Sequence, residues 1–380
     1  MSMITLGRVG QCTTRTTSYH IATVAATLLT AAFVPTIASA QIAGHNVILV
    51  HGFVKEDLLK PPTTAEILSR RKMSPYWQDR AEGYLNWSGA DRIEGGIARI
   101  VFEQAKAYSA QGLCDKGCVL VTHSTGDLVA RYFMQNQANW MRNAGLKPLN
   151  IIATLDYAGA GGGTDLADVA VAAANSEYVP EPMKWAAGMV LGLDLDMTDY
   201  KDLGVVLDLQ TSVSRSHAMA PNSVPRLRFS ASGGDLAEIG MGQVRTITKT
   251  IIRGADDTVV PAHSSCGASA PNAIESCSSK VTYSGKRTSV YGPSGLLNNH
   301  FPVLMAANYD HFNIVKDEQH GLVTYVLNNF MSGLGVDFQT YTQTLTRNWW
   351  ELWKEIGTWQ YVKDSDKKSL SSLIYETFNN

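Results

Sequence analysis

Charged side chains are scarce in this sequence, and neither sign of charge is in clear excess. Only 17% of the 380 residues are charged, and the 32 lysines and arginines do not outnumber the 34 aspartates and glutamates. A net charge of −2 offers no cationic surface to a phosphate backbone, so the composition argues against nucleic acid as a partner. With 45% hydrophobic residues, the chain is also too apolar to remain disordered. The length suits one large globular domain with insertions.

Long hydrophobic runs are absent after residue 40, where no stretch approaches the roughly 20 apolar residues that span a bilayer. Residues 1–40 differ, because two arginines without any acidic residue precede an apolar run over 21–37 and the small residues Ala38-Ser39-Ala40. This order is typical of a secretory signal peptide cut before Gln41, and an uncleaved membrane anchor is the alternative. We therefore expect a secreted protein, extracellular or periplasmic.

Cysteine is rare, and Cys12 would leave with the signal peptide. The others are Cys114, Cys118, Cys266 and Cys277. An even set in an exported protein predicts two disulfides, whereas reduced thiols are the alternative. Sequence alone does not choose among the three connectivities. We favour the local pairs 114–118 and 266–277, because each pair lies in one polar loop that contains glycine or serine.

Internal repeats, low-complexity tracts and the zinc motif H-E-x-x-H are all missing. What the sequence contains is an alternation of buried strands and helices. The runs 47–50, 118–122, 150–155, 224–229 and 248–252 predict strands, and the segments 95–110, 128–134 and 319–330 predict helices. Such alternation predicts a mostly parallel sheet with helices on both faces. Functional residues of these sheets lie on loops at the carboxyl ends of strands.

Ser124 is the strongest candidate nucleophile. It lies in Thr122-His123-Ser124-Thr125-Gly126, between the apolar run CVLVT and the helical segment LVARYFM. This is the G-x-S-x-G motif with threonine in the first position, and it requires a sharp strand-to-helix turn that exposes the serine. Gly126 meets the need for a small residue fully, and Thr122 meets it less well. The alternative is a serine in an ordinary strand–helix turn.

Four segments together resemble bacterial lipases of the α/β-hydrolase superfamily. They are VILVHGF, THSTGDLVARYF, GADDTVVPAHSS and YDHF, in this order, and the resemblance runs roughly from Val47 to Phe330. It implies the α/β-hydrolase fold, with a mostly parallel central sheet, helices on both faces and a cap or lid insertion. It also implies the chain order serine, acid, histidine for the catalytic triad.

The resemblance places the acid three residues before Val260-Pro261, which selects Asp257, with Asp256 as the second choice. Asp256 would otherwise cap the turn through bonds to backbone N–H groups. The base implied by the chain order is His311 in YDHF, with His300 and His320 as rivals.

The oxyanion donors implied by the resemblance are the backbone N–H groups of Phe53 and Thr125. Some lipases of this family carry calcium near the histidine. Here Asn313 occupies a position near His311 where an acidic residue would bind calcium, which argues against a calcium site. Asp256 and Asp310 keep such a site open. We therefore expect no cofactor.

Three segments follow from this interpretation. Residues 41–338 form the catalytic domain, with 157–222 as a cap or lid insertion, and 339–380 form a helical, tryptophan-rich C-terminal extension. The apolar stretch Met183–Leu193 is equally consistent with a mobile lid and with a fixed cap helix. In the extension, helical spacing joins Leu345, Trp349, Leu352, Trp353 and Ile356. We expect this face to dock on the domain rather than to anchor at a lipid–water interface.

Four functions fit the sequence. The first is a lipase or esterase that cleaves triacylglycerols or other long-chain esters through an acyl-serine. The others are a polyester depolymerase, a lipid acyltransferase and a non-catalytic binding protein on the same fold.

Overall fold

The computed structural model describes residues 41–196, 198–218, 223–233, 242–277, 295–306, 308–325, 338–346, 348–351 and 357–380. The signal peptide predicted over residues 1–40 lies outside these ranges and stays a prediction. Within the described ranges, no helix is both long and apolar enough to cross a membrane.

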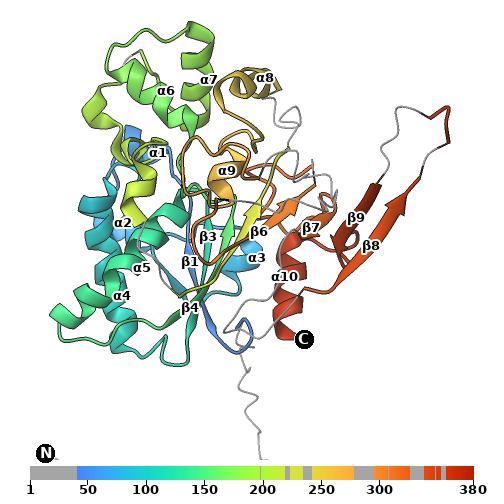
Figure 1. Cartoon of the computed structure of the whole chain (residues 1–380). Coiled ribbons are helices and arrows are strands. Elements are labelled where there is room, and N and C mark those ends of the chain that lie inside the picture. Colours follow the sequence, from blue (N-terminus) through green and yellow to red (C-terminus); the bar gives the residue numbers. More distant parts are fainter. Residues whose placement is uncertain are drawn as a thin grey trace, which may run out of the picture. The chain divides into compact units, whose positions relative to one another are not determined.

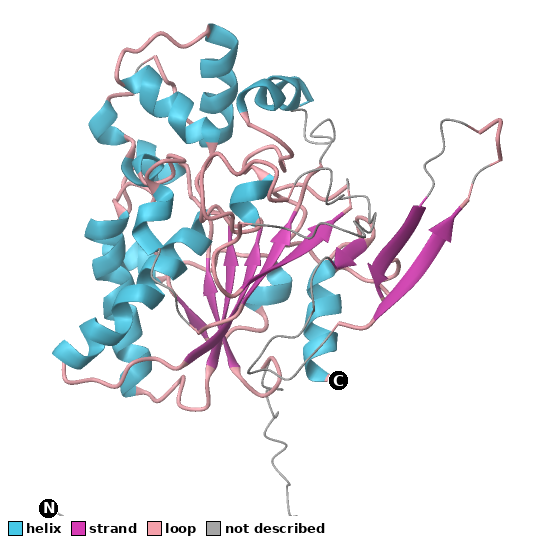
Figure 2. Ribbon diagram, viewed as in Figure 1, coloured by secondary structure: helices cyan, strands magenta, loops and turns pink. Residues whose placement is uncertain are grey.

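Six parallel strands form the centre of the structure (Figures 1 and 2). In spatial order they are β2 (Gly83–Tyr84), β1 (Asn46–Val50), β3 (Cys118–His123), β4 (Ile151–Tyr157), β5 (Arg226–Ser230) and β6 (His300–Met305). Three more strands, β7 (Val323–Tyr325), β9 (Gly357–Val362) and β8 (Thr340–Leu345), extend the β6 edge in antiparallel pairs. The prediction of a mostly parallel sheet is therefore confirmed.

Helices cover both faces of this sheet, as β1 illustrates. Side chains alternate along a strand, so Ile48 and Val50 enter one core cluster while Val47 and Leu49 enter the other. The first cluster contains α4 (Ala98–Ala110) and α5 (Thr125–Asn143), and the second contains α3 (Pro75–Gln78) and α10 (Leu370–Asn379). Three further short elements precede β3, namely α1 (Glu56–Leu59), α2 (Thr64–Leu68) and the π-helical turn η1 (Ile93–Ile97). Helices α8 (Gly242–Ile251) and α9 (Ala262–Ser265) lie between β5 and β6, on either side of the predicted acid Asp257.

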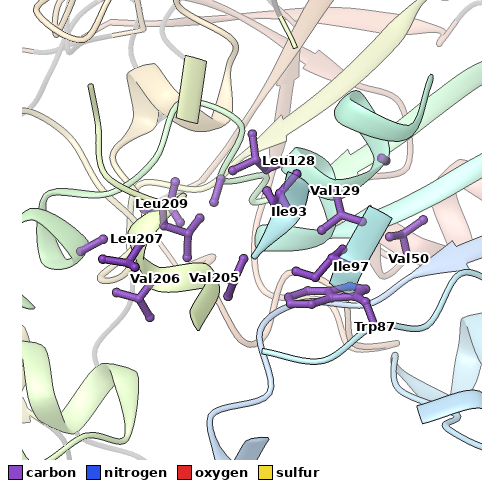
Figure 3. Packing of buried hydrophobic residues seen from close by; sticks show 14 of the residues in the cluster. Val50, Trp87, Ile93, Ile97, Leu128, Val129, Val205, Val206, Leu207 and Leu209 are labelled. Atoms are coloured by element: carbon purple, nitrogen blue, oxygen red, sulfur yellow. The ribbon is translucent and has the colours of Figure 1, made fainter. Parts of the chain in front are cut away.

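The predicted insertion lies between β4 and β5. It contains α6 (Asp165–Ala174), α7 (Glu181–Leu191) and the 3₁₀ turns η2 (Tyr200–Asp202), η3 (Gly204–Leu207) and η4 (Ser214–Ala218). Figure 3 shows Val205, Val206, Leu207 and Leu209 packed in the same cluster as Leu128 and Val129 of α5. This part of the insertion is anchored in the core.

Three predicted elements are wrong. The predicted strand 248–252 does not form: residues 248–251 end helix α8 and Ile252 follows it, because Val244, Thr248 and Ile251 recur at helical spacing and bury one face. Residues 323–325 of the predicted late helix form strand β7, because they pair with β6. The rest of that segment, from 326, lies outside the described residues.

The C-terminal extension is not mainly helical, which is the third correction. Its first part pairs as β8 and β9, and among its described residues only Leu370–Asn379 are helical. Leu345, the first residue of the predicted helical face, ends β8 and pairs with Gly357 across the hairpin. Trp349 is 82% exposed, so the predicted docking is wrong for this residue. Leu352, Trp353 and Ile356 lie outside the described residues.

Both local cysteine pairs are confirmed. Disulfides join Cys114 to Cys118 and Cys266 to Cys277. The second bridge ties the chain just after α9, close in sequence to the predicted acid.

Candidate active site

Ser124 stands at the turn between β3 and α5. Its backbone has a positive φ, with φ 55° and ψ −127°, a conformation that costs a non-glycine residue about 1–3 kcal/mol. Gly126 makes the turn feasible, because a Cβ atom there would lie only 2.2 Å from the carbonyl oxygen of Val50. The surrounding structure therefore holds the serine at the carboxyl end of β3 in a strained turn.

Thr122, the departure from the usual motif, is accommodated by a specific partner. Its buried Oγ1 donates a hydrogen bond of 2.8 Å to Oδ1 of Asp156 on the neighbouring strand β4. A larger residue than glycine is tolerated here because its polar atom joins the two strands.

His311 connects Ser124 with Asp257. Its Nδ1 donates to Oδ2 of Asp257 at 2.9 Å, and its Nε2 lies 2.9 Å from the Oγ of Ser124. Because Nδ1 donates, a neutral ring leaves Nε2 to accept the serine hydroxyl. The structure thus brings together the three residues selected from the sequence, all of them buried.

Asp257 is itself held in place by backbone groups. Its Oδ1 accepts hydrogen bonds from the N–H groups of Val259 at 3.0 Å and Val260 at 2.7 Å. Its own carbonyl oxygen accepts from the N–H of His311 at 3.2 Å. The carboxylate therefore has one oxygen fixed by the turn and the other directed at the imidazole. It follows helix α8, not the strand that the sequence predicted before it.

Asp256 faces a different partner. Its Oδ1 accepts from Arg245 of α8 and from the N–H of Thr258. Burial raises the pKa of Asp256, and the charge of Arg245 opposes this shift. Asp256 therefore fixes the turn, as its alternative role predicted.

Among the described residues, the histidine bonded to the hydroxyl of Ser124 is His311 and neither of its rivals. His300 begins β6, at the amino end of the parallel sheet, and its Nδ1 donates to the carbonyl of Asn298. His320 lies 3.5 Å from Glu318.

His123 is a residue whose place in the site the sequence did not reveal. Its Nε2 donates to the carbonyl oxygen of His311 at 2.8 Å, and the two ring centroids are 4.9 Å apart. Burial, reinforced by the charge of the His311 ring, lowers the pKa of His123 to about 3, so this side chain is neutral. It holds the backbone of His311 from the position next to Ser124. Its only signal in the sequence was that adjacency.

A buried charge cluster lies behind the turn. Asp127, in the first turn of α5, is 2.6 Å from Arg228, which is 3.1 Å from Asp156. Burial alone would raise the pKa of Asp127, but Arg228 and Arg131 outweigh it and hold this pKa below its ordinary value. Burial and the charge of Asp127 raise the pKa of Asp156. These ion pairs join α5, β4 and β5 beneath the serine.

The serine opens onto a cleft of about 450 Å³, here called the serine cleft. Most of its lining is apolar and comes from separate parts of the chain. These walls are Phe53, Ala160, Met189, Val190, Leu191, Leu209, Val259, Val260 and Phe312. Such a cleft suits an apolar chain next to a polar reacting group.

Phe53 and Thr125, the predicted oxyanion donors, both line the serine cleft. The segment before Phe53 runs close to the nucleophile, since a Cβ at Gly52 would lie 3.0 Å from the Cβ of Ser124. Thr125 is the first residue of α5, and the first N–H groups of a helix have no partner inside it. Both placements agree with the predicted role, which stays a prediction.

The expectation of no cofactor, with calcium near His311 as the alternative, also stays a prediction. Asp256 is paired with Arg245, and Oδ1 of Asp310 accepts from the N–H groups of Phe312 and Asn313. Among the described residues, no group of three or more acidic, histidine or cysteine side chains is placed to hold a metal.

Helix α7 contains most of the stretch Met183–Leu193 that was predicted to be a lid or a fixed cap. Leu191 of this helix is buried, whereas Trp185 and Met189 are 44% and 45% exposed. Met189, Val190 and Leu191 also line the serine cleft. The helix therefore borders the cleft with one part and presents apolar side chains to solvent with another.

The sheet, its covering helices and the Ser124 turn define the α/β-hydrolase fold, with a serine–histidine–aspartate arrangement at the carboxyl end of β3. The chain is also similar to several solved structures, at low sequence identity. No protein-family model matches the chain, and no curated protein matches it.

Similar solved structures include three bacterial proteins. The mature lipase BlEst2 of Bacillus licheniformis is 15% identical, with a TM-score of 0.39 over 61% of this chain and 82% of that one. EstA from Clostridium botulinum is 14% identical, with a TM-score of 0.40 over 74% and 85%. The Staphylococcus hyicus lipase is 12% identical, with a TM-score of 0.39 over 71% and 88%.

Proposed function

We propose that this chain is a secreted serine carboxylic-ester hydrolase that cleaves long-chain acyl esters such as triacylglycerols. The observation that carries the proposal is the hydrogen-bonded series Ser124–His311–Asp257, with both imidazole contacts at 2.9 Å, at the wall of an apolar cleft. The cleft gives an acyl chain an apolar environment, and the serine gives its carbonyl carbon a nucleophile.

The proposed reaction proceeds in two half-reactions. In the first, Oγ of Ser124 bonds to the ester carbonyl carbon while Nε2 of His311 takes the proton of this hydroxyl. The same imidazole then protonates the departing alcohol oxygen. The result is an acyl-serine and a free alcohol. Water then loses a proton to His311 and attacks the acyl carbon; the bond to Oγ of Ser124 breaks, the imidazole returns the proton to this Oγ, and the carboxylic acid is released.

Other groups would support these steps. Asp257 keeps the proton of the imidazole on Nδ1 and stabilises its cationic form. The N–H groups of Phe53 and Thr125 would stabilise the tetrahedral oxyanion, and such a donor typically contributes about 3–4 kcal/mol to catalysis. Export is part of the proposal, supported by two disulfides and by the signal-like residues 1–40.

The test begins with the nucleophile. A fluorophosphonate probe should label the wild type at Ser124 and leave the Ser124→Ala variant unlabelled. The variant should fold with an unchanged melting temperature but lose about 10⁴–10⁶-fold in kcat on p-nitrophenyl esters. Substantial turnover by the folded variant would refute the proposal.

A substrate panel then separates the related reactions. Emulsified triacylglycerol, soluble esters of increasing chain length, an insoluble polyester and an ester with added acceptor alcohol would be compared. Release of free acid from the long-chain lipids supports the proposal. Preferential polymer cleavage or acyl transfer to the alcohol would replace it with one of the other two reactions.

A further inference from the structure

A second cleft, here called the lysine cleft, adjoins the serine cleft and has a volume of about 390 Å³. The two clefts share a common wall, which consists of Gly52, Phe53, Glu56, His123 and Phe312. The lysine cleft has walls of its own from two segments, residues 72–75 and residues 315–316, together with His51 and Val54. It is therefore next to the nucleophile but built from other parts of the chain than the insertion.

The charge of the lysine cleft comes mainly from two ammonium groups. Lys72 and Lys316 both line it, both are exposed, and neither side chain has an ion-pair partner among the residues described. Glu56 is the one carboxylate in its lining. Burial lowers the pKa of His51 to about 4 and that of His123 to about 3, so both rings are neutral. Two cationic groups thus face one anionic group.

Ser74 gives an independent indication that a polar ligand belongs here. The side chain lines the lysine cleft, is only 8% exposed, and its Oγ has no hydrogen-bond partner within the described part of the chain. Ser74 stands at the N-cap position of α3, yet its hydroxyl does not cap that helix. Buried hydroxyl groups nearly always have partners, and this Oγ is itself covered, so it would bond to a ligand after the Ser74 side chain rotates toward the cleft.

The position of the lysine cleft fits one part of an ester. His311 itself lines the serine cleft, and three residues that come soon after it in the chain, Phe312, Val315 and Lys316, line the lysine cleft. In the proposed reaction, His311 protonates the departing alcohol, so the alcohol part must lie on the side of the histidine. The acyl part then occupies the apolar serine cleft.

We propose that the lysine cleft binds an anionic group, such as a phosphate, on the alcohol part of the ester, with Lys72, Lys316 and Ser74 as its ligands. The proposal rests on the proposed esterase function of Ser124. Among the acyl esters of that proposal, it predicts a preference for those whose alcohol carries a negative charge.

The test compares 1-butyrylglycerol 3-phosphate with 1-butyrylglycerol, which differ only in the phosphate. At low salt, the wild type should have a kcat/KM about tenfold higher for the phosphate ester, and 0.5 M sodium chloride should reduce this ratio. The double variant Lys72→Gln/Lys316→Gln should lose the preference, mainly through a higher KM for the phosphate ester.

Two further variants make the result specific. Lys116→Gln is the matched control, because Lys116 is also exposed but precedes β3, at the opposite end of the strand from Ser124, and it should keep the ratio. Ser74→Ala should lower the ratio a fewfold without lowering the melting temperature, since Oγ of Ser74 makes no hydrogen bond to the described residues.

Equal kcat/KM values for the two esters in the wild type would overturn the lysine cleft as an anion site, as would a ratio that the double variant leaves unchanged. In either case, fluorophosphonate labelling of Ser124 would show that the esterase proposal stands. Absence of both labelling and hydrolysis would instead overturn the esterase proposal and this inference with it.

Discussion

The two neighbouring carboxylates of the acid loop have separate tasks at the scale of single residues. Asp257 contacts His311, whereas Asp256 contacts Arg245. Asp257→Asn should reduce kcat by about 10⁴-fold, because the imidazole loses the group that fixes its tautomer. Asp256→Asn should keep most of the activity and instead lower the melting temperature, because a largely buried arginine loses its partner. Ester hydrolysis and thermal unfolding of both variants would check this, and interchanged effects would contradict the assignment.

His123 is expected to act as a positioning residue through its hydrogen bond to the carbonyl of His311. His123→Ala should lower kcat about tenfold and leave KM nearly unchanged, because one hydrogen bond that holds the base is lost. His123→Gln keeps a donor and should recover part of this loss. Steady-state kinetics on a soluble ester would distinguish the cases. A rise in KM alone, without recovery by glutamine, would indicate a packing role.

These residues also show how far sequence reasoning reaches at this scale. Ser124, Asp257 and His311 were selected from motifs and chain order, and the structure places them in contact. His123 and Ser74 could not be selected, because their importance depends on which segments fold against them. The contacts of His123 with His311 join residues 188 positions apart.

Helix α7 is the element most suited to respond to a lipid surface. Its Trp185 and Met189 are exposed, and Met189 also lines the serine cleft. An oil–water interface would favour a conformer that transfers these side chains to the apolar phase, at about 25 cal/mol per Å² of buried apolar surface. Trp185→Ser/Met189→Ser should therefore weaken the rise in activity that occurs when a long-chain ester exceeds its solubility.

The control for this prediction lies in the same insertion. Tyr178 is also an exposed aromatic residue, but it precedes α7 and does not line the serine cleft, so Tyr178→Ser should keep the rise. Smooth saturation of the wild type through the solubility limit would show that α7 is a fixed cap.

Errors in predicting elements have a common physical origin. Residues 248–251 are rich in β-branched side chains, which favour strands, yet burial of one face against the insertion makes them helical. Residues 323–325 and 340–345 form strands because β6 and β9 offer them backbone partners. A short stretch of sequence does not contain its strand partners when these are distant in the chain, so the pairing cannot be predicted from it. The runs buried on both faces, such as residues 47–50, were predictable because their composition already reflects burial.

At the scale of the whole molecule, buried histidines make stability depend on pH. Burial lowers the pKa of His51 to about 4, of His123 to about 3 and of His263 to about 4. The unfolded chain takes up these protons below about pH 6.5, whereas the folded protein does not until about pH 4 or lower. The free energy of unfolding should therefore decrease as pH falls through this window, by about 1.4 kcal/mol per pH unit for each histidine.

Thermal unfolding followed by circular dichroism between pH 7 and pH 4.5 would measure this dependence. We expect a steep fall in melting temperature below pH 6.5 and little change above it. His263→Gln retains a polar side chain that cannot be protonated, so the fall should become shallower by about one proton. A melting temperature independent of pH would contradict the neutral, buried state of these rings.

The two clefts beside Ser124 are built by segments that meet only at their shared wall. Met189–Leu191, Leu209 and Val259–Val260 border one, and residues 72–75 and 315–316 border the other. If the clefts bind the substrate as proposed, a substitution in the insertion can alter the preferred acyl chain length without changing the lysine cleft. A substitution in residues 72–75 or 315–316 can likewise alter the preferred alcohol without changing the part of the serine cleft that the insertion forms. In a diverging lineage, selection could therefore act on each half of the substrate separately, and homologues could inherit one preference while losing the other.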